Sequence, residues 1–148
     1  MFLGQYRHNI DSKGRLTVPA RFRELLGEGA YVTMGFDNNL MVMTRASFEA
    51  VQKRVSQTPF TDPNARLVRR LLFSDAGYVE PDGNGRILLP GFLREKATLT
   101  EEAVLVGVGD YFEIWSPDHW ANQSENLSDT AANAQRFIGL ELSAAAED

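Results

Sequence analysis

The sequence predicts a mixed α+β fold, rich in β-strands, that is built from two tandem copies of one small unit. Two observations lead to this prediction. A motif of nine residues returns 71 positions later, and each copy continues with the same order of short strands and short helices. With 148 residues, of which 43% are hydrophobic, the chain can form a core in one domain or in two small ones.

The repeated motif reads DSKGRLTVP at residues 11–19 and DGNGRILLP at residues 82–90. Its Asp, Gly, Arg and Pro occupy the same places in both copies. The match goes on through Arg23-Glu24 and Arg94-Glu95 and, after one inserted residue, through the hairpin that follows. A collinear match over about 40 positions indicates a duplication, whereas a single short motif can recur by chance.

Each copy is predicted to contain four strands: one before the motif, one directly after its arginine, and two that form a hairpin. Alternating side chains indicate the strand before the motif, and turn residues indicate the hairpin. In chain order the strands are Tyr6–Ile10, Leu16–Val18, Tyr31–Phe36 and Leu40–Met43 in the first copy, and Gly77–Glu80, Ile87–Leu89, Val104–Val108 and Phe112–Trp115 in the second.

A short helix follows the motif in each copy, and a longer helix closes the copy. Pro19 and Pro90 are expected to open the short helices, since proline suits the first helical position, and Gly27 to end the first of them. Thr44 and Ser116 are candidate N-caps of the closing helices, because their hydroxyls can accept a hydrogen bond from a free backbone amide.

Four segments are expected along the chain. The first repeat covers residues 1–58, a helical linker covers 59–75, the second repeat covers 76–124, and an acidic C-terminal tail covers 125–148. In the tail, a weak helix is expected near Ser128–Phe137, and the last five residues are expected to be disordered.

The linker is predicted to form an amphipathic helix that starts at Asp62-Pro63 and runs to about Ser74. The apolar stripe of this helix consists of Leu67, Val68, Leu71 and Leu72. Three arginines flank the stripe, namely Arg66, Arg69 and Arg70. The sequence leaves open whether these arginines face DNA, a neighbouring subunit or solvent.

The repeated motif predicts a tight turn. The carboxylates of Asp11 and Asp82 can accept hydrogen bonds from backbone amides two or three residues further on, and Gly14 and Gly85 can adopt a positive φ. All four are therefore expected to form the turns. The same role makes acid–base catalysis by the two aspartates the less favoured hypothesis.

Arg15 and Arg86 stand at the end of each turn, and two hypotheses apply to them. In the structural hypothesis, each arginine only pairs with the aspartate of its own turn. In the functional hypothesis, the turn presents the guanidinium to an external partner, since its planar donors match a phosphate or the O6/N7 edge of guanine. Lys13 adds a positive charge in the first copy, where the second has Asn84, so the copies are not expected to be equivalent.

Charge is distributed unevenly along the chain. The net charge of −5 by itself argues against a nucleic-acid partner. However, residues 1–96 hold 14 Lys/Arg and 10 Asp/Glu, whereas residues 97–148 hold one Arg and 10 Asp/Glu. A local basic face is compatible with an acidic protein, because salt screens charges beyond about 8 Å.

Other classes of function find little support in the sequence. The chain has no cysteine, and His8 and His119 lack a nearby third ligand, so no metal site is expected. A calcium loop beginning at Asp82 fails, because Arg86 and Leu93 occupy places that need oxygen ligands. No catalytic triad, dinucleotide loop, signal peptide or membrane span stands out, so no enzyme, cofactor, small-molecule substrate or membrane partner is expected.

Four stretches of the sequence together resemble the MraZ family: MFLG at the start, DSKGRLTVPARFR, RLVRRLLFSDA and DGNGRILLP. The resemblance covers residues 1–125. The family belongs to the wider AbrB/SpoVT group, and the resemblance implies that two tandem AbrB-like units form a pseudo-dimeric swapped-hairpin β-barrel with short flanking helices. The two repeats then play the part of two AbrB-type subunits within one chain.

The resemblance also implies a cytoplasmic, nucleoid-associated regulator of transcription that binds DNA in a sequence-specific way. The implied partners are double-stranded DNA with short tandem promoter repeats, ahead of a cell-division and cell-wall gene cluster, and further copies of the chain in a ring. Carried over by position, the DNA-contact residues are Lys13, Arg15 and Arg86. Two alternatives stay open, an oligomeric scaffold protein and an antitoxin-type repressor of the AbrB group.

Overall fold

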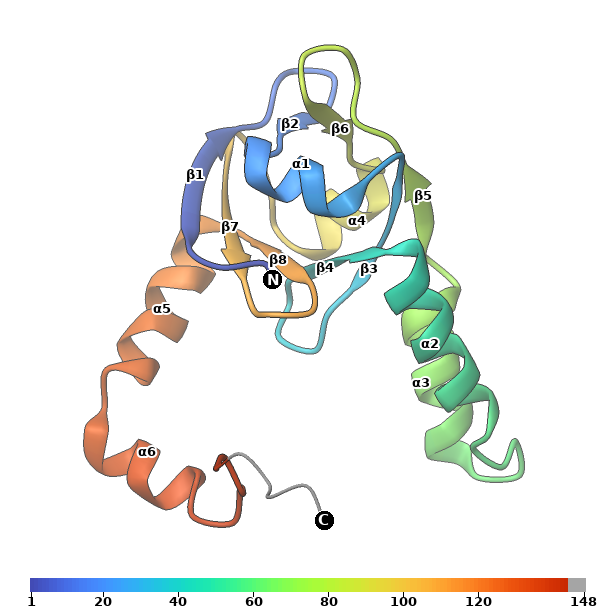
Figure 1. Cartoon of the computed structure of the whole chain (residues 1–148), viewed down its shortest axis with the longest axis vertical. Coiled ribbons are helices and arrows are strands. Elements are labelled where there is room, and N and C mark those ends of the chain that lie inside the picture. The colour runs from blue at the N-terminus through green and yellow to red at the C-terminus, as the bar shows by residue number, and fades with distance from the viewer. Residues whose placement is uncertain (144–148) are drawn as a thin grey trace. The chain divides into compact units, whose positions relative to one another are not determined.

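The computed structural model describes residues 1–143 (Figure 1). The strands in this part of the chain are β1 (Gln5–Asn9), β2 (Arg15–Thr17), β3 (Ala30–Met34), β4 (Leu40–Thr44), β5 (Gly77–Val79), β6 (Arg86–Leu88), β7 (Glu102–Gly107) and β8 (Phe112–Trp115). The helices are α1 (Ala20–Leu26), α2 (Arg45–Ser56), α3 (Pro63–Phe73), α4 (Gly91–Lys96), α5 (Pro117–Leu127) and α6 (Thr130–Arg136). The last five residues, which the sequence predicts to be disordered, lie outside the described residues.

The chain divides into two compact units, Met1–Pro117 and a second unit that begins at Asp118. The first unit contains all the described strands and helices α1 to α4, so both repeats share it. The second unit contains most of α5 and all of α6, whose first turn is capped by Asp129 through a 3.0 Å hydrogen bond from the Ala132 amide. None of the helices within residues 1–143 has the length and apolar character needed to cross a membrane.

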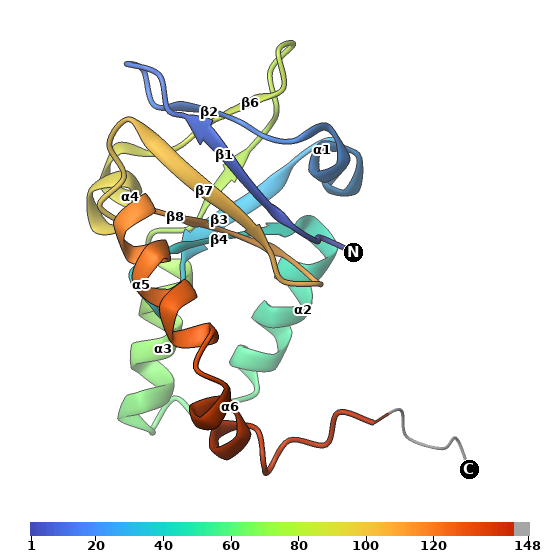
Figure 2. The ribbon, with the colours of Figure 1, turned by 90° about the vertical axis from the view of Figure 1, so that its left-hand side faces the viewer.

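Six strands form one antiparallel sheet in which the two repeats are interleaved (Figure 2). The order of the strands is β1-β7-β8-β4-β3-β5. The first strand of each repeat pairs with the hairpin of the other repeat, since β1 pairs with β7 and β5 pairs with β3. Neither repeat therefore completes its own part of the sheet.

The predicted mixed α+β class with a large antiparallel sheet is confirmed. The hydrogen-bonded order ends at β1 on one side and at β5 on the other, and within residues 1–143 no ladder joins these two strands. The closed swapped-hairpin barrel therefore stays a prediction.

The two remaining strands form a separate two-stranded ribbon at one end of the unit (Figure 1). β2 and β6 pair antiparallel, with Leu16 opposite Ile87 at the centre. Both of these side chains are fully buried. Because successive side chains of a strand point to opposite faces, the residues on either side of them lie on the outer face of the ribbon. Both strands begin one residue earlier than the sequence predicts, at Arg15 and Arg86.

An aromatic cluster joins the two repeats in the core. Phe22 of α1 packs against Phe2 with ring centroids 5.3 Å apart and against Phe112 of β8 with centroids 4.9 Å apart. All three side chains are buried. Burying a side chain of this size contributes about 1.5–3 kcal/mol relative to leaving it in water. The same core thus stabilises both copies of the unit.

Local capping explains where the helices begin. The Thr44 hydroxyl accepts a hydrogen bond from the Ser47 amide at 3.1 Å and caps α2, as predicted. The Asp62 carboxylate accepts one from the Asn64 amide at 2.9 Å and caps α3, which begins at Pro63. Pro19 occupies the N-cap of α1, so this helix starts one residue later than expected.

The apolar stripe of α3 is covered on one side only. Leu72 is buried in a cluster with Met41 and Met43 of β4. Leu67 and Leu71, in contrast, are 59% and 36% exposed. The prediction of an amphipathic helix is confirmed, but half of its apolar face has no cover within the described chain.

Candidate nucleic-acid interface

The first turn is held by the carboxylate of Asp11. Its Oδ1 accepts hydrogen bonds from the amides of Lys13 and Arg15 at 3.0 and 2.9 Å, and its Oδ2 accepts one from Arg15 Nε at 2.7 Å. The Gly14 amide donates to the Asp11 carbonyl at 3.0 Å, and Gly14 adopts a φ of +86°. Residues with a side chain rarely adopt this φ, which explains the glycine.

The second turn repeats this geometry. Asp82 Oδ1 accepts hydrogen bonds from the amides of Asn84 and Arg86 at 2.8 and 3.0 Å, and Oδ2 accepts one from Arg86 Nε at 3.2 Å. The Gly85 amide donates to the Asp82 carbonyl at 3.0 Å with a φ of +75°. The structure therefore gives the four turn-forming residues of the motif the same local role in both copies.

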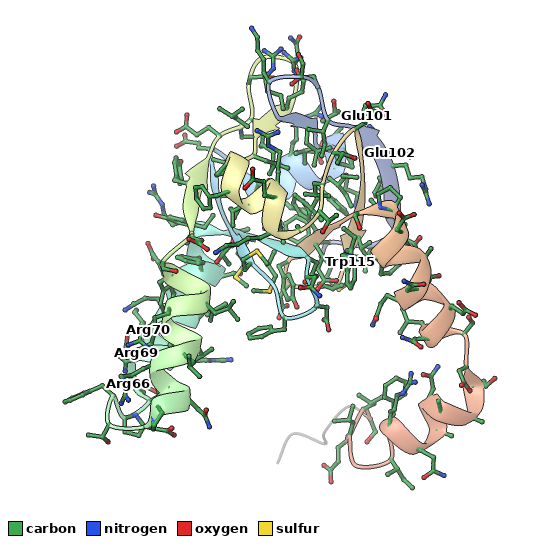
Figure 3. All side chains as sticks on the ribbon, turned by 180° about the vertical axis from the view of Figure 1, so that it is seen from behind. Arg66, Arg69, Arg70, Glu101, Glu102 and Trp115 are labelled. Carbon is green, nitrogen blue, oxygen red and sulfur yellow. The ribbon has the colours of Figure 1, made fainter. Side chains whose placement is uncertain are left out.

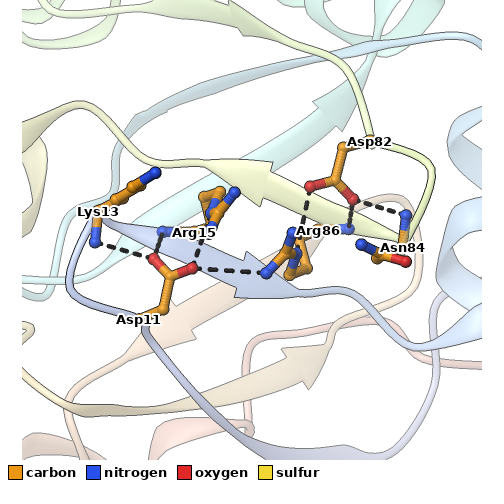
Figure 4. A network of polar contacts seen from close by, with 6 residues as sticks. All are labelled: Asp11, Lys13, Arg15, Asp82, Asn84 and Arg86. Atoms are coloured by element: carbon orange, nitrogen blue, oxygen red, sulfur yellow. Dashed lines mark hydrogen bonds and ion pairs between the residues drawn. The ribbon is translucent and has the colours of Figure 1, made fainter.

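The ribbon brings the two turns together (Figure 4). Arg15 is the first residue of β2 and Arg86 is the first residue of β6, and both lie on the outer face of the ribbon. Arg86 Nη1 also lies 3.5 Å from Asp11 Oδ2, so Asp11 faces the arginines of both repeats. Within residues 1–143, Arg15 makes no equivalent ion pair with Asp82.

The hydrogen bonds to the two aspartates keep these carboxyl groups ionised. The backbone amide of Arg15 lowers the pKa of Asp11 most strongly; partial burial opposes it, and the Arg15 side chain and the Lys13 amide add to the lowering. The pKa of Asp11 falls from 3.8 to about 2. The pKa of Asp82 is also lowered, with the Arg86 amide as the largest cause. Both carboxylates therefore stay ionised to a lower pH than an ordinary aspartate does.

Arg15 and Lys13 have hydrogen-bond donors that remain available to an external partner. An arginine has five N–H donors, and Arg15 uses only its Nε proton within the described part of the chain. The Arg15 side chain is 33% exposed, and Lys13 is exposed without an ion pair among residues 1–143. The turn thus holds the guanidinium in one orientation and leaves its outer edge free to bind an anion or a base edge.

Sequence reasoning missed two further arginines at this surface. The guanidinium of Arg94 lies at Gly14, and that of Arg23 lies at Gly85. A Cβ added to Gly14 would meet Arg94 Cζ at 2.7 Å, and one added to Gly85 would meet Arg23 Cζ at 2.6 Å. The signal was present, because both arginines recur at the repeat offset, but the repeat alone does not show which turn each of them reaches.

The three linker arginines lie on α3, far from the ribbon (Figure 3). Arg66 Nη1 donates to the Phe60 carbonyl at 2.9 Å, and Arg69 Nη2 donates to the Thr58 carbonyl at 2.6 Å. These two arginines therefore bind the connection between α2 and α3. Arg70 instead lines a groove along α3.

This groove has a volume of about 570 Å³, and both apolar and polar or charged side chains line it. Leu67, Leu71 and Phe36 contribute to its wall, and Phe36 is 66% exposed. Exposed apolar surface of this kind often marks a contact with another protein. Helix α3, along which the groove runs, extends away from the ribbon (Figure 1).

Comparison with known proteins agrees with the duplication. The profile of the family described as "MraZ protein, putative antitoxin-like" matches residues 1–71 and again residues 72–139. The chain is 47% identical over 137 residues to a protein of Roseiflexus castenholzii, and the aligned region covers 93% of this chain and 94% of the relative. It is 49% identical over 138 residues to a protein of Desulfitobacterium hafniense, with 93% and 96% covered.

A third relative, from Desulforamulus reducens, is 51% identical over 120 residues, with 81% of this chain and 84% of the relative covered. All three relatives are named "Transcriptional regulator MraZ". That name describes regulation and not catalysis, which agrees with the prediction that the chain is not an enzyme. With two family matches that span most of its length and relatives this similar, the chain belongs to the MraZ family.

Proposed function

We propose that this chain is a DNA-binding regulator of transcription that contacts double-stranded DNA with the outer face of the β2–β6 ribbon. One observation supports this most directly. Two arginines from two copies of one turn lie on one face of a ribbon, each oriented through its Nε by a carboxylate. An ion pair between one arginine and one carboxylate can serve stability alone. The outer N–H groups of Arg15, however, have no role within the described chain.

The proposed binding site on the DNA is the major groove. A two-stranded β-ribbon fits into this groove, where arginine can bind the O6 and N7 atoms of guanine with two hydrogen bonds. In this proposal Arg15 and Arg86 contact base edges, and Lys13 contacts a phosphate. The expected discrimination is about 1–3 kcal/mol for each good two-bond contact. One chain therefore recognises only a few base pairs.

We further propose that several copies assemble into a ring and bind tandem boxes together. The interleaved repeats would form the swapped-hairpin barrel of each copy, and the exposed apolar groove on α3 is the surface we assign to contact with a second copy. Linked sites can raise avidity by about 10²–10⁴ when the geometry lets both engage. A ring would thus compensate for the weak binding of one ribbon and for the net charge of −5.

The proposal is tested with the variant Arg15→Ala/Arg86→Ala and with Arg54→Ala as a charge control on α2. Fragments selected from genomic DNA by the wild-type chain supply a recognised box and a scrambled box. We expect the double variant to lose its preference for the box while keeping the native circular dichroism spectrum, and Arg54→Ala to keep both. A double variant that still prefers the box would exclude the ribbon as the reading surface.

DNAs with one, two, three or four boxes test the ring. Affinity should rise steeply with the number of boxes. It should fall when the spacing between two boxes is changed by half a helical turn, because one turn of about 10–10.5 base pairs returns the same face of the groove to the protein. Equal affinity for one box and four boxes would exclude the proposed avidity. A chain that forms an oligomer but prefers no DNA would favour the scaffold hypothesis instead.

A further inference from the structure

Each turn of the motif is supported by residues from the other repeat. The Gly85 carbonyl, in the second turn, accepts a hydrogen bond from the Val18 amide at 2.9 Å. The Gly14 carbonyl, in the first turn, accepts one from the Leu89 amide at 2.9 Å. Val18 and Leu89 occupy equivalent positions directly before the motif's proline. The backbone contacts at the two turns are therefore reciprocal.

A helix arginine completes each of these contacts. Arg23 of α1 donates from Nη1 to the Val18 carbonyl at 2.5 Å, and its guanidinium lies against Gly85. Arg94 of α4 donates from Nε to the Leu89 carbonyl at 3.2 Å, and its guanidinium lies against Gly14. Both arginines are partly buried. Each one thus binds the residue that directly follows the ribbon strand of its own repeat and contacts the turn of the other repeat.

We propose that Arg23 and Arg94 are positioning residues that act across the repeats: the arginine of each repeat holds the motif turn of the other repeat in place. The guanidinium fills the space that a side chain on the turn glycine would need, and it also binds the residue whose amide holds that glycine's carbonyl. Removing Arg23 should therefore loosen the second turn and leave the first turn intact. Removing Arg94 should do the reverse.

This arrangement gives a second reason, besides the positive φ, why glycine is required in the two turns. A methyl group on Gly85 would displace the Arg23 guanidinium and so break its hydrogen bond to Val18. The strain from φ is local, but the displacement involves a residue far away in the sequence. Two substitutions that share one contact are not additive, whereas two substitutions without a shared contact are. Additivity therefore distinguishes crosswise support, in which a turn is held by the arginine of the other repeat, from support by the arginine of the same repeat.

Double-mutant cycles measured by urea unfolding provide the test. The fall in the unfolding midpoint caused by Gly85→Ala should be smaller in the Arg23→Ala background than in the wild type, and unchanged in the Arg94→Ala background. Gly14→Ala should show the mirror pattern. Additive effects in the crosswise pairs, or coupling in the same-repeat pairs, would overturn the proposal.

Milder variants provide a second measurement in case the alanine variants do not fold. Arg23→Lys keeps the charge but loses the planar guanidinium. Hydrogen exchange should become faster in the peptide that contains residues 82–86 and stay unchanged in the peptide that contains residues 11–15. Arg94→Lys should do the opposite, and Arg21→Ala, at an exposed position on α1, should change neither peptide. Uniform acceleration of both peptides would contradict crosswise support.

The consequence for DNA rests on the proposed function and is measured separately. Arg23→Lys should weaken binding to the recognised box in the wild-type background and have no further effect in the Arg86→Ala background, because both changes act through the second turn. If the cycles and the exchange data show crosswise coupling but DNA binding does not change, the positioning proposal stands and the assignment of the ribbon to DNA fails.

Discussion

The two motif turns share one backbone geometry but differ in how their arginines are held. Within residues 1–143, the Arg15 guanidinium pairs with the carboxylate of Asp11 alone. Arg86 lies between two carboxylates, Asp82 at 3.2 Å and Asp11 at 3.5 Å. Lys13, which has no ion pair within the described part of the chain, adds a positive charge beside the first turn, and Asn84 takes its place beside the second.

Duplication thus preserved the geometry of the turns without making their chemistry equal. The hydrogen bonds from Asp to backbone amides depend on neighbours in the chain, so they recur wherever the motif recurs. The ion pair from Arg86 to Asp11 depends on how the two turns meet, and the described structure makes it in one direction only. We therefore expect the first turn to be the stronger DNA-contact element.

The largest expected effect separates the two arginines. Arg15→Ala should abolish preference for the recognised box, because losing a two-bond contact with guanine costs about 1–3 kcal/mol per site and the loss is repeated in every linked copy. Arg86→Ala should weaken binding less, since its guanidinium is already shared by two carboxylates. Fluorescence anisotropy with the box and a scrambled box measures both. Equal losses for the two variants would show that the turns are equivalent.

The next effect concerns stability. Gly14→Val and Gly85→Val should each destabilise the fold by about 1–3 kcal/mol, because a β-branched residue is strained at a positive φ. Gly139→Val, outside the turns, is the matched control, since nothing lies within 4 Å of an added Cβ there. The midpoints of thermal unfolding give the comparison. If both turn variants have the same unfolding midpoint as the wild type, the turns do not need glycine.

The pH dependence of stability should distinguish the two aspartates. A carboxyl group with a lowered pKa in the folded state stabilises the fold above its ordinary pKa, and this stability is lost as the pH falls through the folded value. For Asp11 the window lies between pH 3.8 and about 2. Asp11→Asn should therefore flatten the decline of stability across this window. Asp82→Asn should flatten it less, because Asp82 faces one guanidinium and Asp11 faces two.

Urea unfolding at several pH values between 2 and 7 follows this loss. Glu141→Gln, in the second unit, serves as the control with the same change of charge. If the free energy of unfolding of Asp11→Asn depends on pH as in the wild type, the turn carboxylate contributes nothing to acid unfolding.

The smallest expected effect tests the one difference in charge between the two motifs. Lys13→Asn should reduce the salt dependence of DNA binding, and Asn84→Lys should increase it, each by about 0.9 in the slope of log K against log salt for every phosphate contact changed. Preference for the recognised box should stay the same, because phosphate contacts do not specify sequence. A change in base preference for either variant would place that position at a base edge.

Local interactions made much of this molecule predictable from its sequence. The D-x-x-G-R turns, the Thr44 and Asp62 caps and the strand order within each repeat depend on residues a few positions apart. Within such distances the required φ, the capping hydroxyl or carboxylate and the alternation of side chains can be read directly. The sequence by itself therefore determined the elements, the duplication and the identity of the turn residues.

Only the tertiary structure decided how the two copies meet. The pairing of β1 with β7 and of β5 with β3, the ion pair from Arg86 to Asp11, and the crosswise contacts of Arg23 and Arg94 all join residues of different repeats. A repeated sequence offers each of these residues two equivalent partners, one in its own copy and one in the other. The choice between them depends on which arrangement buries Leu16, Ile87 and the shared aromatic core, and burial of that kind is a property of the whole fold.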